Sequence, residues 1–211
     1  MMIGLSVDFC YLNVVGFLCY TAFNASLYWS NILQEEYARR HDGKQIKVAP
    51  NDVAFAMHAV VLSICWVLQI WCYNGIFRRK PYIITMVSIS VIVGTSLLYA
   101  AVIAIFGNEN NGAYLNWLDF LYTLANFKVC ITIFKYCPQV ILNCHRRSTE
   151  GWNIWNILLD FTGGILSVLQ LLLDCWNTGD WSGITGNPAK FALGFVSIIF
   201  DVSRFCRDLR L

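Results

Sequence analysis

The chain has 211 residues, of which 57% are hydrophobic and 15% aromatic, and its formal net charge is +2 at pH 7. Only 13% of the residues are charged, whereas about 25% are charged in an average soluble domain. This composition excludes an ordinary soluble domain and predicts an all-α, polytopic membrane protein.

Three long apolar runs come first along the chain, at residues 9–34, 53–77 and 81–108. Each exceeds the ~20 residues that a helix needs to cross a bilayer. Three weaker runs, each with one or more ionisable groups, follow at about 113–141, 152–175 and 189–206. We predict six transmembrane helices, because the runs are continuously apolar and do not alternate as the strands of a membrane barrel do.

The basic residues of the connecting segments predict the orientation in the membrane. Loops 107–112 and 177–187 contain no Lys or Arg, and loop 35–52 mixes basic with acidic residues. The opposite side carries an excess of positive charge, from Arg78, Arg79, Lys80, Arg146, Arg147, Arg207 and Arg210. We therefore expect both termini to be cytosolic.

An internal repeat predicts the domain organisation. Residues 4–17 align without a gap with residues 151–164, so that Asn13 matches Asp160 and Gly16 matches Gly163. This offset equates the first span with the fifth. Two parallel three-helix repeats joined by a linker helix are typical of alternating-access transporters.

The expected boundaries follow from this offset. Residues 1–77, including loop 35–52, form the first repeat, residues 78–112 the linker helix, and residues 113–211 the second repeat. The first repeat has two spans where the second has three. We therefore expect it to be incomplete, with its opening helix before Met1 or supplied by another copy or subunit.

Polar residues within the fourth span predict a path for a polar solute. Lys128 and Lys135 are seven residues apart and share a helix face. Lys128 is suited to a substrate carboxylate, whereas Lys135 is equally compatible with reaching the cytosolic interface. Pro138 removes a backbone hydrogen bond and predicts a hinge with Gln139; alternatively, Pro138 only ends the span.

Asp160 is the candidate proton-coupling residue within the fifth span. A carboxylate about ten residues into a span is costly unless it is solvated, paired or protonated. Asn156 lies one turn earlier on the same face, and the alternative is an aspartate fixed to a lysine. Asp52 at the start of the second span and Asp201 in the sixth have structural alternatives, a helix N-cap for Asp52 and pairing with Arg204 for Asp201.

No enzyme or nucleic-acid signature accompanies these residues. The sequence contains no Gly-x-Ser-x-Gly, His-Glu-x-x-His or phosphate-binding loop, and no sustained basic patch. The nine cysteines lack metal-ligand spacing and are expected to be packing residues. We expect no catalytic residues, no metal and no cofactor.

An ordered set of motifs resembles the cystinosin family of PQ-loop proteins across nearly the whole chain. The second PQ-loop motif corresponds to Pro138-Gln139 and the segment Leu159–Gly164. Further matching segments are Gly4–Phe9, Asn51–Val53, His58–Leu62, Ser148–Trp152 and Phe200–Val202. By this resemblance, we expect the chain to lack the lumenal domain, first PQ helix and tyrosine-based sorting signal that the family has.

The resemblance implies a function and assigns roles to residues. It implies proton-coupled export of L-cystine from a lysosomal, endosomal or vacuolar membrane by alternating access. It implies a gating hinge at Pro138 and Gln139 and proton coupling by Asp160, Asp201 and Asp52. The implied substrate pocket comprises Asn13, Lys128, Lys135, Asn143, Asn156 and Asp160.

Two other functions remain open from the sequence. One is a truncated, non-transporting isoform that acts as an interaction or regulatory protein. The other is a PQ-loop transporter of a different small amino acid or of a sugar, although charged residues within spans favour a zwitterion.

Overall fold

The computed structural model describes residues 7–46, 48–74, 81–107, 115–146, 154–179 and 181; for residues 74, 135–146, 154–161 and 178 it describes the backbone alone. All regular elements of these segments are α-helices, which agrees with the predicted all-α membrane protein. They are α1 (Val7–Trp29), α2 (Asn31–Arg40), α3 (Pro50–Asn74), α4 (Ile83–Phe106), α5 (Trp117–Arg146) and α6 (Ile154–Thr178).

Within the described residues, four helical segments are long and apolar enough to cross a membrane: Val7–Trp29, Pro50–Tyr73, Ile83–Phe106 and Trp117–Phe134. They coincide with the first four predicted spans. The fifth predicted span, residues 152–175, is confirmed as a helix by α6. The sixth, residues 189–206, lies outside the described residues.

The prediction was wrong about the end of the first span and about loop 35–52. The first helix ends at Trp29, and the separate helix α2 occupies residues that were assigned partly to the span and partly to the loop. Ser30 has an extended backbone and its hydroxyl accepts a hydrogen bond from Leu33 N–H at 3.5 Å, as an N-cap does. This cap starts a new helix where apolar composition alone suggested continuation.

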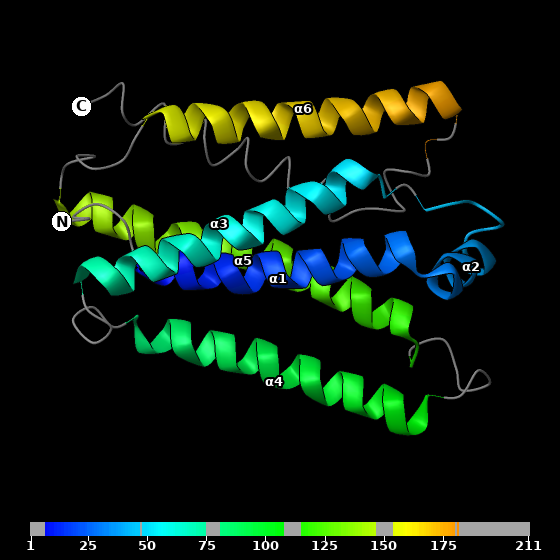
Figure 1. The fold of residues 1–211 in the computed structure, drawn as a ribbon, viewed down its shortest axis with the longest axis horizontal. Coiled ribbons are helices and arrows are strands. Elements are labelled where there is room, and N and C mark those ends of the chain that lie inside the picture. The colour runs from blue at the N-terminus through cyan, green and yellow to red at the C-terminus, as the bar shows by residue number, and fades with distance from the viewer. Residues whose placement is uncertain are drawn as a thin grey trace.

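The helices form a bundle with α1 at its centre (Figure 1). Helix α1 packs against α3 and α5, while α4 contacts α5 and α1. In the view of Figure 1, α4 and α6 flank these central helices on opposite sides. Helix α2 lies at the end of the bundle where α1 ends and α3 and α5 begin; we call this the α2 end.

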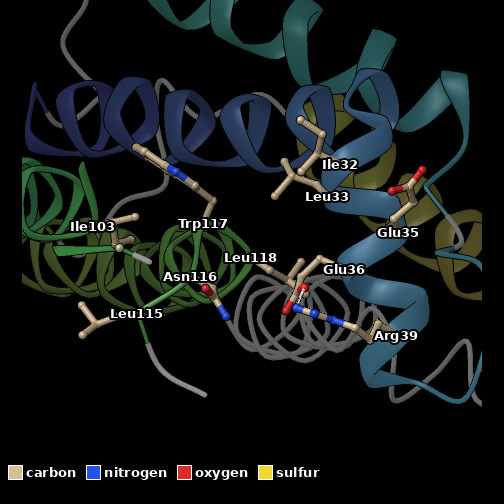
Figure 2. Close-up of a pocket in the computed structure, with 11 residues that line it drawn as sticks. Ile32, Leu33, Glu35, Glu36, Arg39, Ile103, Leu115, Asn116, Trp117 and Leu118 are labelled. Atoms are coloured by element: carbon tan, nitrogen blue, oxygen red, sulfur yellow. Dashed lines mark hydrogen bonds and ion pairs between the residues drawn. The ribbon is translucent and has the colours of Figure 1, made fainter. Parts of the chain in front are cut away.

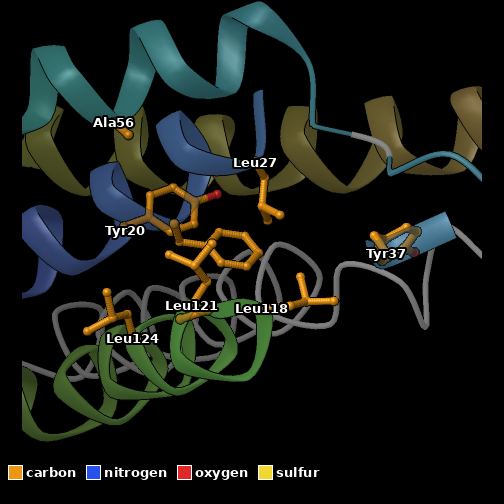
Figure 3. Packing of buried hydrophobic residues seen from close by; sticks show 9 residues of the cluster. Tyr20, Leu27, Tyr37, Ala56, Leu118, Leu121 and Leu124 are labelled. Atoms are coloured by element: carbon orange, nitrogen blue, oxygen red, sulfur yellow. The ribbon is translucent and has the colours of Figure 1, made fainter. Parts of the chain in front are cut away.

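Two apolar clusters hold the central helices together. The larger cluster, at the α2 end, joins α1, α2, α3 and α5 (Figure 3). Its members are Tyr20, Phe23, Leu27, Tyr37, Ala56, Leu118, Leu121, Leu124 and Ala125. The smaller cluster, at the opposite end, joins α1 to α3 through Val7, Phe9, Cys10, Val67 and Ile70. Helix α1 is therefore packed on α3 along its length, and the α5 side chains that the structure describes contribute to the cluster at the α2 end.

Gly16 allows α1 and α5 to approach closely between these clusters. A Cβ atom at Gly16 would lie 3.1 Å from Ile131 Cγ2 and 3.3 Å from Lys128 Cδ. Small residues permit close packing of transmembrane helices in the same way. Since Lys128 is a candidate site residue, Gly16 also determines how near that side chain lies to α1.

We predict that Gly16→Ala lowers the thermal unfolding midpoint of the purified protein. The added methyl group forces apart two packed helices, and such overpacking costs about 1–3 kcal/mol, against a gain of up to ~1 kcal/mol in helix propensity. Gly94→Ala on α4 is the matched control, because a Cβ there meets no atom within 4 Å. Its midpoint should stay the same or rise. Equal midpoints for the two variants would contradict the close approach at Gly16.

Candidate functional site

The predicted site residues divide by what the structure describes of them. Asn13, Lys128 and Asp52 are described with their side chains, and all three are buried. Asp201 lies outside the described residues. The others are described by their helical backbone alone, so the orientation of their side chains is outside the described part: Lys135, Pro138, Gln139, Asn143, Asn156 and Asp160.

The backbone of α5 decides one alternative for Pro138. The helix runs without interruption from Trp117 to Arg146, so Pro138 lies within it and does not end it. Arg146, which was expected in a connecting loop, is the last residue of α5, so that assignment was wrong, whereas the end of the membrane span at about residue 141 stays a prediction. A proline inside a membrane helix leaves one backbone carbonyl without its usual donor, which is the condition that a hinge requires.

Lys128 lies in the packed interior between α5 and α1. Its residue is 3% exposed, and its Nζ atom lies 3.5 Å from the centroid of the Phe17 ring. The face of an aromatic ring carries partial negative charge and attracts a cation within about 6 Å. Phe17 is itself held edge-on by Phe55 of α3, with ring centroids 6.2 Å apart and an interplanar angle of 75°. Three helices thus fix the position of one ammonium group.

Asn13 occupies the same face of α1, one turn before Phe17. Its Nδ2 atom donates a hydrogen bond to Ser63 Oγ of α3 at 3.2 Å, and both residues are buried. Buried amide groups are costly unless they are hydrogen-bonded. Ser63 therefore fixes the amide of Asn13, and the structure brings Asn13 and Lys128 to the same middle portion of α1.

Asp52 has a capping role at the start of α3. The sequence suggested a helix N-cap as the structural alternative for Asp52. The helix begins at Pro50, so Asp52 lies within its first turn and is not the N-cap itself. Its Oδ2 atom reaches back and accepts a hydrogen bond from Ala49 N–H at 3.1 Å, as the acidic residue of a capping box does. Asp52 is 7% exposed and lies at the α2 end, away from Lys128 along the bundle.

Four residues that the sequence analysis did not select support these side chains or the position of α1. Gly16 and Phe17 contact Lys128, and Ser63 holds Asn13. Asp8, which is 4% exposed, accepts a hydrogen bond from Tyr82 N–H at 2.7 Å and so ties α1 to the start of α4. The spacing of Asn13 and Phe17 on one helix face was a usable signal, whereas the pairing of α1 with α3 and α4 is a long-range property without a local pattern.

A pocket of about 400 Å³ lies elsewhere, between α2, α4 and α5 (Figure 2). Apolar side chains such as Leu33 and Ile103 line it together with Glu35, Glu36 and Arg39. Figure 2 shows the ion pair between Glu36 and Arg39 on its wall. Asn13, Lys128 and Asp52, the predicted site residues whose side chains the structure describes, do not line this pocket.

An ion-pair network beside this pocket fixes α2 to α5. Arg40 contacts Glu36 at 2.7 Å and Asp119 of α5 at 2.8 Å. The Asn116 amide, oriented with its oxygen toward Arg40, accepts a further hydrogen bond at 2.5 Å. Hydrogen bonding to Asp119 raises the pKa of the Arg40 guanidinium above its ordinary value. The contribution of this shift to the folding stability is lost only as the pH rises through the raised pKa. Arg40 therefore stays charged at every physiological pH.

Comparison with known proteins places these features in a family. Residues 120–180 match the family model described as PQ loop repeat. Cystinosin of Drosophila melanogaster is 42% identical over 94% of this chain and 48% of its own length. The cystinosin homolog of Dictyostelium discoideum is 37% identical over 95% of this chain and 68% of its own length. The chain belongs to the cystinosin family.

Similarity within the cystinosin family extends to a yeast protein named for its substrate. The cystine transporter of Saccharomyces cerevisiae is 28% identical over 94% of this chain and 78% of its own length. Against the Drosophila cystinosin, the chain spans about half of the relative's length. The predicted resemblance to cystinosins is therefore confirmed, together with the assignment to polytopic PQ-loop membrane proteins.

We predict that Ser63→Ala destabilises the protein by about 0.5–1.5 kcal/mol, the net contribution of a buried hydrogen bond. The change removes the acceptor for Asn13 Nδ2 at the α1–α3 interface while the buried amide of Asn13 remains. Ser88→Ala on α4 is the control, because Ser88 is exposed and donates to Ile84 O of its own helix. Thermal unfolding in detergent measures both variants. A loss at Ser88 as large as that at Ser63 would contradict the importance of the interhelical bond.

We predict that Arg40→Met lowers the unfolding midpoint more than Arg39→Met does. Arg40 joins α2 to α5, whereas the side chain of Arg39 is 69% exposed and pairs only within α2. Exposed and partly exposed pairs contribute about 0.2–1 kcal/mol each. A double-mutant cycle of Arg40→Met with Asp119→Asn should give a coupling of this size that shrinks as salt is added. If the two changes had strictly additive effects on the free energy of unfolding at low salt, this prediction would be contradicted.

Proposed function

We propose that this chain carries out proton-coupled export of L-cystine from a lysosome or related acidic organelle to the cytosol by alternating access. The observation that supports it most is the buried Lys128 ammonium in a membrane-spanning chain of the cystinosin family. Ionisable residues within spans are rare because their burial is costly, and they mark substrate or ion pathways. Binding of a transported zwitterion would explain why an ionisable residue is present within this span.

The chemistry of cystine matches the residues proposed for the pocket. Cystine has two carboxylates and two ammonium groups, so its site needs charges of both signs separated by amide groups. In the proposed site Lys128 meets a substrate carboxylate and Asn13 adds an amide beside it. Lys135, Asn143 and Asn156 extend the same mixture of groups, and Asp160 supplies the negative charge. A neutral sugar would offer Lys128 no carboxylate.

The proton enters the proposed cycle through carboxylates. A protonated Asp160 crosses the hydrophobic interior at lower cost than an ionised one, because desolvation penalises the charged form. Lumenal acidity therefore favours reorientation of the loaded carrier, and the neutral cytosol favours release of the proton. Asp201 and Asp52 are proposed as further groups in proton movement, with Asp52 already committed to a hydrogen bond from Ala49 N–H.

The proposed hinge would convert this protonation into movement. Pro138 lies within the continuous α5 backbone, and a bend there would move the part of α5 beyond it relative to Lys128. Gln139 directly follows this proline, which leaves a carbonyl of the preceding turn without its usual donor. This assignment of a gate to Pro138 and Gln139 is part of the proposal.

We predict that Asp160→Asn lowers proton-driven uptake of labelled cystine by about tenfold or more, equivalent to ~1.4 kcal/mol or more in the barrier. The measurement uses the full chain in lipid vesicles, over a range of external pH, with cystine-evoked proton movement recorded in parallel. Asp174→Asn, near the other end of α6, is the matched control and should retain the pH dependence of wild type.

Two outcomes would overturn the proposal. Absence of cystine uptake by the wild-type chain would remove the transport function. Cystine uptake by Asp160→Asn with unchanged pH dependence would remove the proton-coupling role and leave transport itself intact.

A further inference from the structure

We propose that the pocket between α2, α4 and α5 binds the headgroup of an ethanolamine phospholipid, with the lipid ammonium on Glu35 and the lipid phosphate on Arg39. This inference goes beyond the proposed function and does not depend on cystine transport. The juxtaposition that carries it is a cavity of about 400 Å³ between the charged side of α2 and the apolar ends of α4 and α5 (Figure 2).

The pocket lies where two membrane-spanning helices end. Helix α4 ends at Phe106, and the apolar segment of α5 begins at Trp117. Trp117 lines the pocket and is 49% exposed, and tryptophan is enriched at the boundary between the membrane core and the headgroups. The cavity is therefore level with the headgroup region of the bilayer.

The walls of the pocket suit the two parts of a phospholipid. Its charged side chains come from α2, whereas Ile103 of α4 and Trp117 of α5 lie on the opposite side in Figure 2. Pockets for small ligands measure about 300–1,000 Å³, so this cavity can hold a headgroup, and the acyl chains would extend outside it. The adjacent helix α4 is apolar, and only 6% of its most apolar segment is buried in the bundle. Its surface is therefore available to the chains.

The charges of the pocket favour a zwitterionic headgroup over an anionic one. Two carboxylates, Glu35 and Glu36, line the pocket together with one guanidinium, that of Arg39. Glu36 pairs with Arg40 as well as with Arg39, so it keeps a partner when Arg39 turns toward a phosphate. Glu35 and Arg39 are four residues apart and are neighbours on the helix surface. An ethanolamine headgroup, whose ammonium and phosphate are two carbons apart, can contact both.

The carboxylate of Glu35 distinguishes ethanolamine from choline. A primary ammonium donates charge-assisted hydrogen bonds to a carboxylate, whereas the trimethylammonium group of choline has no N–H to donate. Glu35 is exposed, so its side chain can turn toward a headgroup without leaving the packed interior. We therefore expect the pocket to prefer ethanolamine phospholipid among lipids of the same chain length.

Lipid binding to the full chain in detergent tests the site. Native mass spectrometry should give a Kd for dioleoylphosphatidylethanolamine that is about fivefold lower, or more, than the Kd for dioleoylphosphatidylcholine or dioleoylphosphatidylglycerol. At ten times its Kd, the ethanolamine lipid should raise the thermal unfolding midpoint by about 3 °C or more. Absence of bound ethanolamine lipid, or equally tight binding of the choline or glycerol lipid, would overturn the proposal.

Two substitutions test the two halves of the headgroup separately. Glu35→Gln should weaken binding of the ethanolamine lipid about fivefold and leave the choline lipid unaffected, because the amide carries no negative charge. Arg39→Gln should weaken binding of both lipids, because both have a phosphate. Asp42→Asn is the matched control: it removes one negative charge from an exposed residue outside the pocket lining, and asparagine tolerates the positive φ of 54° there. Unchanged affinity in Glu35→Gln, or an equal loss in Asp42→Asn, would contradict a specific site.

A soluble headgroup distinguishes a lipid from a free metabolite as the ligand. Glycerophosphoethanolamine has the same ammonium and phosphate but no acyl chains. At 100 times the Kd of the ethanolamine lipid, it should neither displace the bound lipid nor raise the unfolding midpoint. Displacement at concentrations near that Kd would overturn the assignment to a phospholipid and would indicate a pocket for a soluble amine phosphate.

Discussion

A buried ammonium group is the constraint on which the centre of this structure depends. Lys128 is 3% exposed in the interior of a membrane-spanning helix, where an isolated charge costs at least about 2.5–3.5 kcal/mol. Such a residue persists only if neighbouring helices hold it against groups that favour a cation. The close contact at Gly16, the ring of Phe17 and the support of that ring by Phe55 are the described consequences of this requirement.

The two ends of the bundle are held together by different contacts. At the α2 end, α1 and α5 are joined by the larger apolar cluster and by the Arg40–Asp119 ion pair. Toward the other end, the described apolar packing of α1 is against α3, and Asp8 links it to the start of α4. In the predicted repeat arrangement, α1 and α5 belong to different repeats, so their contact is where the proposed alternating access would require movement. Pro138 lies in the part of α5 beyond these described contacts, which is where the proposed hinge is placed.

Sequence patterns were sufficient for the class and for most of the helices because transmembrane segments are long, apolar and locally encoded. They failed at Ser30, where the N-cap of α2 interrupts an apolar run, and at Asp52, which caps α3 from within its first turn. They selected Lys128 and Asn13 because a polar group in a span is conspicuous. They did not select Ser63 or Phe17, since a serine or a phenylalanine in an apolar helix is unremarkable until its partner on another helix is known.

An aromatic ring lowers the cost of a buried cation without adding a second charge. A cation–π contact is worth about 0.5–2 kcal/mol, whereas breaking a buried ion pair costs about 3–5 kcal/mol because it leaves one charge uncompensated. The Phe17 ring is therefore a weaker partner for the Lys128 ammonium than a carboxylate of cystine would be in the proposed function. In the proposed cycle, the ring contact stabilises Lys128 within the span without preventing its interaction with a zwitterion.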